Sequence, residues 1–192
     1  MFIQTEATPN PSVLKFIPGR DILGSGGAHE FRTADDAEAS PLADSIFALE
    51  GVSKVFFGPD YLTVAIGPGY EWPQVKAPVL AAIMDHYTSG RPLFFTAPAA
   101  VSVHSDDVAY EGDVAEVVQE IKDLLDQRIR PAVAQDGGDI LFSRFEPDTG
   151  VVWLHMKGAC SGCPSSALTL KSGVENMLKH YVPEVTRVEQ TL

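Results

Sequence analysis

The chain of 192 residues contains only two cysteines, Cys160 and Cys163, and no long uninterrupted apolar run. No stretch approaches the roughly 18 apolar residues that a membrane-spanning helix needs. The first residues lack the basic and apolar regions of a secretory signal, and also the arginine-rich pattern of a transit peptide. Two closely spaced cysteines without an export signal indicate a reducing compartment. We therefore expect a cytoplasmic protein without a structural disulfide.

Basic residues are scarce as well, because 14 Lys and Arg stand against 26 Asp and Glu, a formal net charge of −12. No local basic patch offsets this total. A chain so acidic is repelled by phosphate backbones and by anionic lipid surfaces. Hydrophobic residues at 45% and charged residues at 21% are ordinary for globular proteins. The composition thus predicts packed domains that bind neither nucleic acid nor membranes.

Residues 1–90 predict one small α+β domain. Alternating apolar residues between turn-forming Pro and Gly favour short strands, and apolar residues at helical spacing indicate two helices. Residues 18–40 are rich in glycine and acids and are expected to be mostly loop. The predicted elements are strands at 2–6 and 12–17, a helix from Ser40 to Gly51, a hairpin turning at Gly58-Pro59-Asp60, and a helix ending near Gly90 that starts or kinks at Pro78.

Residues 113–192 predict a second small α+β domain, and residues 91–112 a flexible linker between the two. The predicted elements are a helix over 114–129 that stops near 131–135, a hairpin of strands 140–145 and 151–156, a helix from Pro164, and a strand at 185–188. We expect a small sheet covered on one face by two helices, with the cysteine loop exposed at its edge. No clear βαβ crossover is visible in this order of elements.

The two cysteines form a Cys-x-x-Cys loop. Thiols at this spacing can converge on a metal, an iron–sulfur cluster or each other. Pro164 favours the first turn of a helix, which makes Cys163 the N-cap. The helix dipole there would lower the pKa of the Cys163 thiol. Gly158 and Gly162 leave room for backbone N–H groups to approach sulfur.

Four interpretations of this loop remain open from the residues alone: a pair of core cysteines, a dithiol redox site, a structural zinc site, or half of an iron–sulfur site. In the thioredoxin arrangement proline lies between the cysteines, whereas here it follows the second. Zinc needs four protein ligands, and the chain offers two thiolates with no nearby Cys or His pair. Clusters usually take four thiolates, which a symmetric dimer supplies from two loops. The ligand count therefore favours a shared cluster.

Two parts of the sequence resemble a known family. Asp136-Gly137-Gly138-Asp139 and Gly158-Ala159-Cys160-Ser161-Gly162-Cys163-Pro164-Ser165-Ser166 are similar to the C-terminal domain of NifU, the module of Nfu-type iron–sulfur scaffold and carrier proteins. The opening Thr5-Glu6-Ala7-Thr8-Pro9-Asn10-Pro11, followed by Leu14-Lys15-Phe16, resembles the N-terminal domain that accompanies it. The resemblance covers nearly the whole chain, and the cysteine motif is its specific part.

The resemblance implies both a function and its ligands. It implies that Cys160 and Cys163 bind a [4Fe–4S] cluster shared by the two protomers of a homodimer, and it leaves open whether a [2Fe–2S] form also occurs. The cluster would come from upstream cluster-assembly proteins and pass to recipient apo-proteins, so the chain would be a scaffold and carrier and not an enzyme. The N-terminal domain would hold no cluster ligand. The alternative is a thioredoxin-like thiol–disulfide oxidoreductase that uses the same two cysteines.

Other polar residues have simpler interpretations. His155 is expected at an ordinary strand position. Asp136 and Asp139 flank glycines that need unusual φ angles, so turn and capping roles are expected for them and not metal binding. The loop Gly24-Ser25-Gly26-Gly27 lacks the Gly-Lys-Ser/Thr of a phosphate-binding loop. No Ser/His/Asp set has a sequence signature here.

Overall fold

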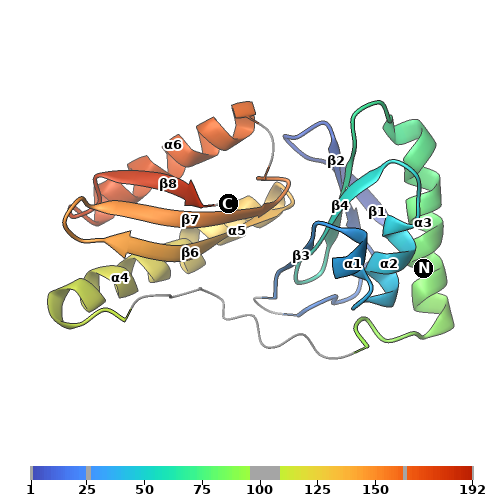
Figure 1. Cartoon of the computed structure of the whole chain (residues 1–192), viewed down its shortest axis with the longest axis horizontal. Helices are drawn as coiled ribbons and strands as arrows, with labels where there is room; N and C mark the ends of the chain where they lie inside the picture. The colour runs from blue at the N-terminus through green and yellow to red at the C-terminus, as the bar shows by residue number, and fades with distance from the viewer. Residues whose placement is uncertain (1, 25–26, 96–108, 162–163, 192) are drawn as a thin grey trace. The chain divides into compact units, whose positions relative to one another are not determined.

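The computed structural model describes residues 2–24, 27–95, 109–161 and 164–191, and describes no side chains for 164–168. The chain divides into two compact units, Met1–Val101 and Ser102–Leu192 (Figure 1). Both units combine helices with a sheet, which confirms two small α+β domains. Most of the predicted linker, residues 96–108, lies outside the described residues.

The first unit is built on a five-stranded antiparallel sheet with the order β1-β2-β5-β4-β3. Its predicted hairpin is confirmed, since β4 and β5 pair on either side of the Gly58 turn. Both N-terminal strands are also found within two residues of their expected bounds. The strands are β1 (Gln4–Ala7), β2 (Val13–Ile17), β3 (His29–Phe31), β4 (Val52–Phe57) and β5 (Leu62–Ile66).

Three helices complete this unit: α1 (Ala34–Ala37), α2 (Pro41–Phe47) and α3 (Trp72–Ser89). Helix α2 begins as predicted, because the Ser40 side chain accepts a hydrogen bond from the backbone N–H of Ala43. Helix α3 runs through Pro78 without starting there and ends at Gly90, whose φ of 66° is left-handed. Helices α2 and α3 pack together against the sheet (Figure 1).

Residues 18–40 hold two elements that the sequence did not reveal, β3 and α1. Strand β3 has only three residues, too few to show a period, and it exists through pairing with β4 and burial of Phe31. The Phe31 ring lies 5.0 Å from that of Phe57 and 6.1 Å from that of Phe94, measured between centroids. Residues 93 and 94, predicted as linker, thus pack on the first unit.

The second unit opens with one long helical segment that changes its winding. Helix α4 (Gly112–Leu124) continues into a π-helical turn, η1 (Leu125–Ile129), and then into α5 (Arg130–Gln135). Pro131 has no N–H, and its ring would meet the carbonyl four residues earlier in a regular α-helix. A wider turn just before it relieves that conflict. This explains why the helix does not stop at Pro131.

The sheet of the second unit has the order β6-β7-β8. Strands β6 (Gly138–Glu146) and β7 (Val151–Gly158) form the predicted antiparallel hairpin. Helix α6 (Pro164–Tyr181) then leads to β8 (Arg187–Thr191), which pairs with β7 in parallel. β7, α6 and β8 therefore form a βαβ crossover, and the prediction that none exists is wrong. A parallel partner leaves no local sequence signal, because the pairing is made across a whole helix.

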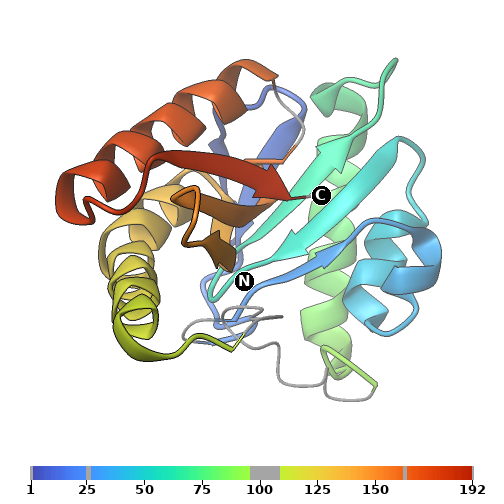
Figure 2. The ribbon, with the colours of Figure 1, turned by 60° about the vertical axis from the view of Figure 1, so that its left-hand side comes forward.

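The core of the second unit lies between this sheet and the two long helices. Alternate residues of β6 and β7 point into it, among them Ile140, Phe142 and Leu154, and all are buried. Ile121 from α4 and Leu178 from α6 meet them, each with no exposed surface. Figure 2 shows both helices on the same side of the sheet, as predicted.

Among the described helices, none is both long and apolar enough to cross a membrane.

Tyr110 closes the free edge of β6. This strand pairs on one side only, so its outward N–H and C=O groups have no partner strand. The Tyr110 hydroxyl donates to the carbonyl oxygen of Phe145 at 3.0 Å and accepts from the N–H of the same residue at 2.7 Å. One side chain thereby satisfies two backbone groups at the edge.

Tyr110→Phe is expected to destabilise the second unit by about 1–2 kcal/mol, because both groups of Phe145 lose their partner. Denaturant unfolding followed by amide resonances of β6 and β7 measures the change. The matched control is Tyr181→Phe. Tyr181 is 41% exposed and its hydroxyl accepts from Arg128, so this change should stay within about 0.5 kcal/mol. Equal effects in the two variants would contradict the role of Tyr110.

Candidate functional site

Cys160 lies just beyond the end of β7, at the open end of the β6–β7 hairpin. β7 ends at Gly158, which has a φ of 63°. The next residue, Ala159, donates its N–H to the carbonyl of Gly137 at 3.1 Å, and the N–H of Ser161 donates to that of Gly158 at 3.1 Å. The backbone around Cys160 is therefore held against the turn that precedes β6.

The side chain of Cys160 is buried in the core of the second unit and only 7% exposed. The expectation of an exposed cysteine loop is therefore wrong at this residue. A sequence of glycines and serines suggested an edge loop, but the sulfur turns inward to fill space beside β6. Helix α6 begins at Pro164 as predicted. Cys163 and Gly162 lie outside the described residues, so the predicted N-cap role of Cys163 stays a prediction.

The surroundings of Cys160 favour the neutral thiol. Burial raises the pKa of the Cys160 thiol to about 12, and the carboxylates of Asp136 and Asp139 act in the same direction. Attack on a disulfide needs an accessible thiolate. Cys160 has neither property in this structure, which argues against it as a redox nucleophile.

Gly138 makes room for Cys160. A Cβ at position 138 would overlap the Cys160 sulfur and would lie 2.8 Å from the carbonyl oxygen of Lys157. The sequence suggested that both glycines of the turn provide unusual φ angles. This holds for Gly137, with a φ of 82°, whereas Gly138 has no positive φ and is needed for its lack of a side chain. No local pattern could have revealed this, because the contact joins residues 22 positions apart.

Asp139 is held by a partly buried arginine, Arg130. Its two carboxylate oxygens accept from Nε and Nη2 of Arg130 at 2.8 and 2.9 Å, and Oδ1 also accepts from the N–H of Ile140. Arg130 reaches Asp126 as well, at 3.0 Å. Burial alone would lower the pKa of Arg130, but the two carboxylates outweigh it and raise that pKa. Asp139 thus has a structural role, as expected, although its partner was not predicted.

The remaining candidates add no further metal ligands. His155 lies within β7, as predicted, opposite Leu141 of β6. Asp136 follows the last turn of α5 and is exposed. In the described parts of the chain, no three or more His, Cys, Asp or Glu side chains come together in a way that could hold a metal ion. Within those ranges one copy of the chain therefore offers no complete metal site.

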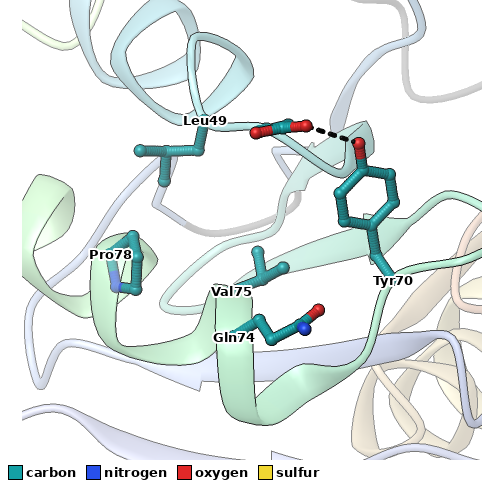
Figure 3. Close-up of a pocket in the computed structure, with 6 residues that line it drawn as sticks. Leu49, Tyr70, Gln74, Val75 and Pro78 are labelled. Carbon is teal, nitrogen blue, oxygen red and sulfur yellow. Dashed lines mark hydrogen bonds between the residues drawn. The ribbon is translucent and has the colours of Figure 1, made fainter.

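The described residues of the first unit line two shallow pockets. One of about 470 Å³ lies between the end of α2 and the start of α3 (Figure 3). The Tyr70 hydroxyl donates to Glu50 across its rim at 3.0 Å, so these two polar groups satisfy each other. Leu49, Val75 and Pro78 supply apolar lining. The second pocket, of about 210 Å³, lies at the other end of α3.

The chain thus consists of two α+β units, and the second packs Cys160 of its Cys-x-x-Cys motif against the Gly137-Gly138 turn. Residues 3–90 match the family described as "Scaffold protein Nfu/NifU N terminal", and residues 121–189 match the family described as "NifU-like domain". The chain belongs to the NifU-like family of iron–sulfur cluster scaffold proteins, as its sequence motifs suggested.

Three relatives match 99% of the chain over 190 residues. "NifU-like protein 4, mitochondrial" and "NifU-like protein 5, mitochondrial" of Arabidopsis thaliana are 52% and 50% identical, with 66% and 68% of their lengths covered. "NFU1 iron-sulfur cluster scaffold homolog, mitochondrial" of Drosophila ananassae is 50% identical, with 64% covered. The chain therefore spans about two thirds of the length of these relatives.

These relatives correct one expectation from the sequence. The predicted cytoplasmic location is contradicted by these three relatives, because all of them are named as mitochondrial proteins. Two closely spaced cysteines indicate a reducing environment, and more than one compartment meets that condition.

Gly138→Ala is expected to destabilise the second unit by about 1–3 kcal/mol, because the new methyl group must displace Cys160 or the backbone at Lys157. Gly173→Ala in α6 is the matched control. No atom lies within 4 Å of a Cβ built at Gly173, so alanine there should be neutral or stabilise by up to about 1 kcal/mol. Hydrogen exchange of the β6 and β7 amides measures the change of stability in both variants. Unchanged protection in Gly138→Ala would show that the contact with Cys160 is not tight.

Arg130→Met is expected to cost about 3–5 kcal/mol, because it leaves the Asp139 carboxylate buried without its counter-ion. Replacing both residues, in Arg130→Met with Asp139→Leu, should cost clearly less. Lys179→Met is the control, since Lys179 pairs with Glu175 at the surface and should contribute at most about 0.5 kcal/mol. Urea unfolding measures the loss of stability in each of the three variants. A double variant as unstable as Arg130→Met would exclude the buried charge as the cause.

Proposed function

We propose that two copies of this chain hold an iron–sulfur cluster between them, through Cys160 and Cys163 of each copy, and pass it to apo-proteins. The observation that carries the proposal is the placement of Cys160 against Gly138, directly before helix α6. Gly138, in the turn that resembles the family, therefore lies beside Cys160 of the cysteine motif. The cluster is the cargo of this protein and not a permanent cofactor.

The number of thiols supports a shared cluster. The chain has two cysteines, and an iron–sulfur cluster usually takes four thiolate ligands. A symmetric dimer brings two identical loops together and so supplies all four. We propose a [4Fe–4S] cluster as the main form, which gives roughly two iron atoms per chain. A [2Fe–2S] cluster on the same four thiolates would give roughly one.

Transfer then proceeds by exchange of ligands. A recipient thiolate forms a new bond to iron as the bond between iron and Cys160 or Cys163 breaks, and the recipient's thiol proton passes to solvent or to the released sulfur. No electron is transferred in this step. The buried position of Cys160 supports such a role, because the freed side chain has an apolar site to return to. Upstream assembly proteins would load the dimer, and recipient apo-proteins would unload it.

The rival function is thiol–disulfide exchange by the same pair. The burial of Cys160 and its raised pKa weigh against it. The βαβ crossover around the loop weighs slightly for it, because the thioredoxin motif also precedes a helix in such a unit. The two functions differ in a simple measurement, since only an oxidoreductase reduces insulin in the presence of a reductase.

Anaerobic reconstitution with ferrous iron and sulfide is expected to give a brown protein with the mass of a dimer. Cys160→Ser and Cys163→Ser should each abolish the colour and the dimer, because each removes two of the four ligands. Ser161→Ala, between the two cysteines, is the matched control and should reconstitute fully. Mössbauer spectra identify the cluster, and its delivery is measured as recovered activity of an apo-enzyme that needs the same cluster.

Two results would contradict the proposal. A coloured cluster that survives in Cys160→Ser, or a holo-protein with the mass of one chain, would exclude a site shared through these cysteines. Insulin reduction by the apo-protein, with no transfer to any apo-enzyme, would favour the oxidoreductase.

A further inference from the structure

The first unit carries a small pocket with an unusual set of polar groups. It has a volume of about 210 Å³ and lies between residues 20–22 and the C-terminal end of helix α3. Two arginines line it, Arg20 and Arg91, in a chain whose net charge is −12. Asp21 also lines it, which leaves the lining with a formal charge of +1.

The two arginines differ in how much of their binding capacity is used. Arg91 is paired with Asp85 at 2.5 Å and donates to the Ser89 hydroxyl at 3.0 Å. Arg20 lies 5.9 Å from the centre of the Tyr87 ring and makes no ion pair with any residue that the structure describes. Its guanidinium group therefore keeps the capacity to bind a carboxylate with two parallel hydrogen bonds.

Two of the residues that line the pocket each have a buried polar atom without a partner. Nδ1 of His86 and the hydroxyl of Tyr87 have no hydrogen-bond partner among the described residues. His86 is only 3% exposed. Burial and the positive charge of Arg91 lower the pKa of His86, so its ring is neutral near pH 7 and carries one N–H. Buried polar groups without partners are rare in folded proteins, and they often mark a place where a ligand or an ordered water belongs.

We propose that this pocket binds a small organic carboxylate, with its charged group at Arg20 and its carbon chain against the apolar part of the wall. Ile22, Leu93 and the Tyr87 ring supply that apolar part. Arg91 is already paired with Asp85, so the Arg20 guanidinium is the cation of this lining that remains for a monoanion. A carboxylate oxygen is an acceptor for the Tyr87 hydroxyl, which has no hydrogen-bond partner among the described residues.

Titration of the apo-protein, full chain, with acetate, butyrate and inorganic phosphate tests the site. We expect saturable shifts of the amide resonances of Arg20, Gly90 and Arg91 at constant ionic strength. Butyrate should bind roughly tenfold more tightly than acetate, because each methylene that enters an apolar site gains about fourfold. Phosphate binding as tight as that of butyrate would overturn the assignment of a carboxylate, and sodium chloride in place of all three is the baseline.

Two variants locate the site. Arg20→Gln should weaken butyrate binding by at least about tenfold, because it removes the charged hydrogen bonds. The control Arg32→Gln has the same change of charge in the same unit, away from the pocket, and should leave binding unchanged. Tyr87→Phe should weaken binding without lowering the thermal midpoint of the free protein, since the lost hydroxyl had no partner. The proposal would be overturned if the unchanged protein showed no saturable shift. It would also be overturned if Arg20→Gln and Tyr87→Phe bound butyrate as tightly as the unchanged protein. The cluster is absent throughout, so this test is independent of the proposed carrier function.

Discussion

The partly buried ion pair between Arg130 and Asp139 is the constraint on which the rest of the second unit depends. It joins the first turn of α5 to the first residues of β6 with two hydrogen bonds of 2.8 and 2.9 Å. An unpaired charge at either position would be costly in this core. Because Asp139 cannot move, Gly138 beside it is fixed, and Gly138 is the residue against which the Cys160 sulfur packs. The position of Cys160 thus depends on an arginine at the start of helix α5.

This arrangement gives Cys160 two opposed properties. Its sulfur has a place in the apolar core, and the nearby carboxylates favour its neutral form. A permanent metal site would present thiolates already aimed at the metal. A carrier must release its cluster, and a cysteine ligand leaves iron more easily when its side chain can return to a stable position in the apolar core. Iron binding needs the thiolate just as redox attack does, so Cys160 must leave this buried position and lose its proton before it can act as a ligand.

The first unit supplies no cysteine and has a chemistry of its own. Its antiparallel sheet and helix α3 form a separate core, and the polar pocket at the end of α3 uses residues that play no part in cluster binding. A unit of this kind can add a second binding function to a scaffold without disturbing the cysteine loop. The two sites proposed for this chain would then differ in their chemistry.

The sequence by itself determined the local elements and the family. Apolar periodicity located helix α4, turn residues located the hairpins, Ser40 and Pro164 marked helix starts, and the Cys-x-x-Cys motif with its flanking glycines indicated the family. Each of these signals comes from neighbours in the chain. Only the tertiary structure decided the parallel pairing of β8 with β7, the partner of Asp139, the need for glycine at 138 and the burial of Cys160. These features join residues that are distant in sequence, and their energies come from packing and desolvation, which no local pattern records.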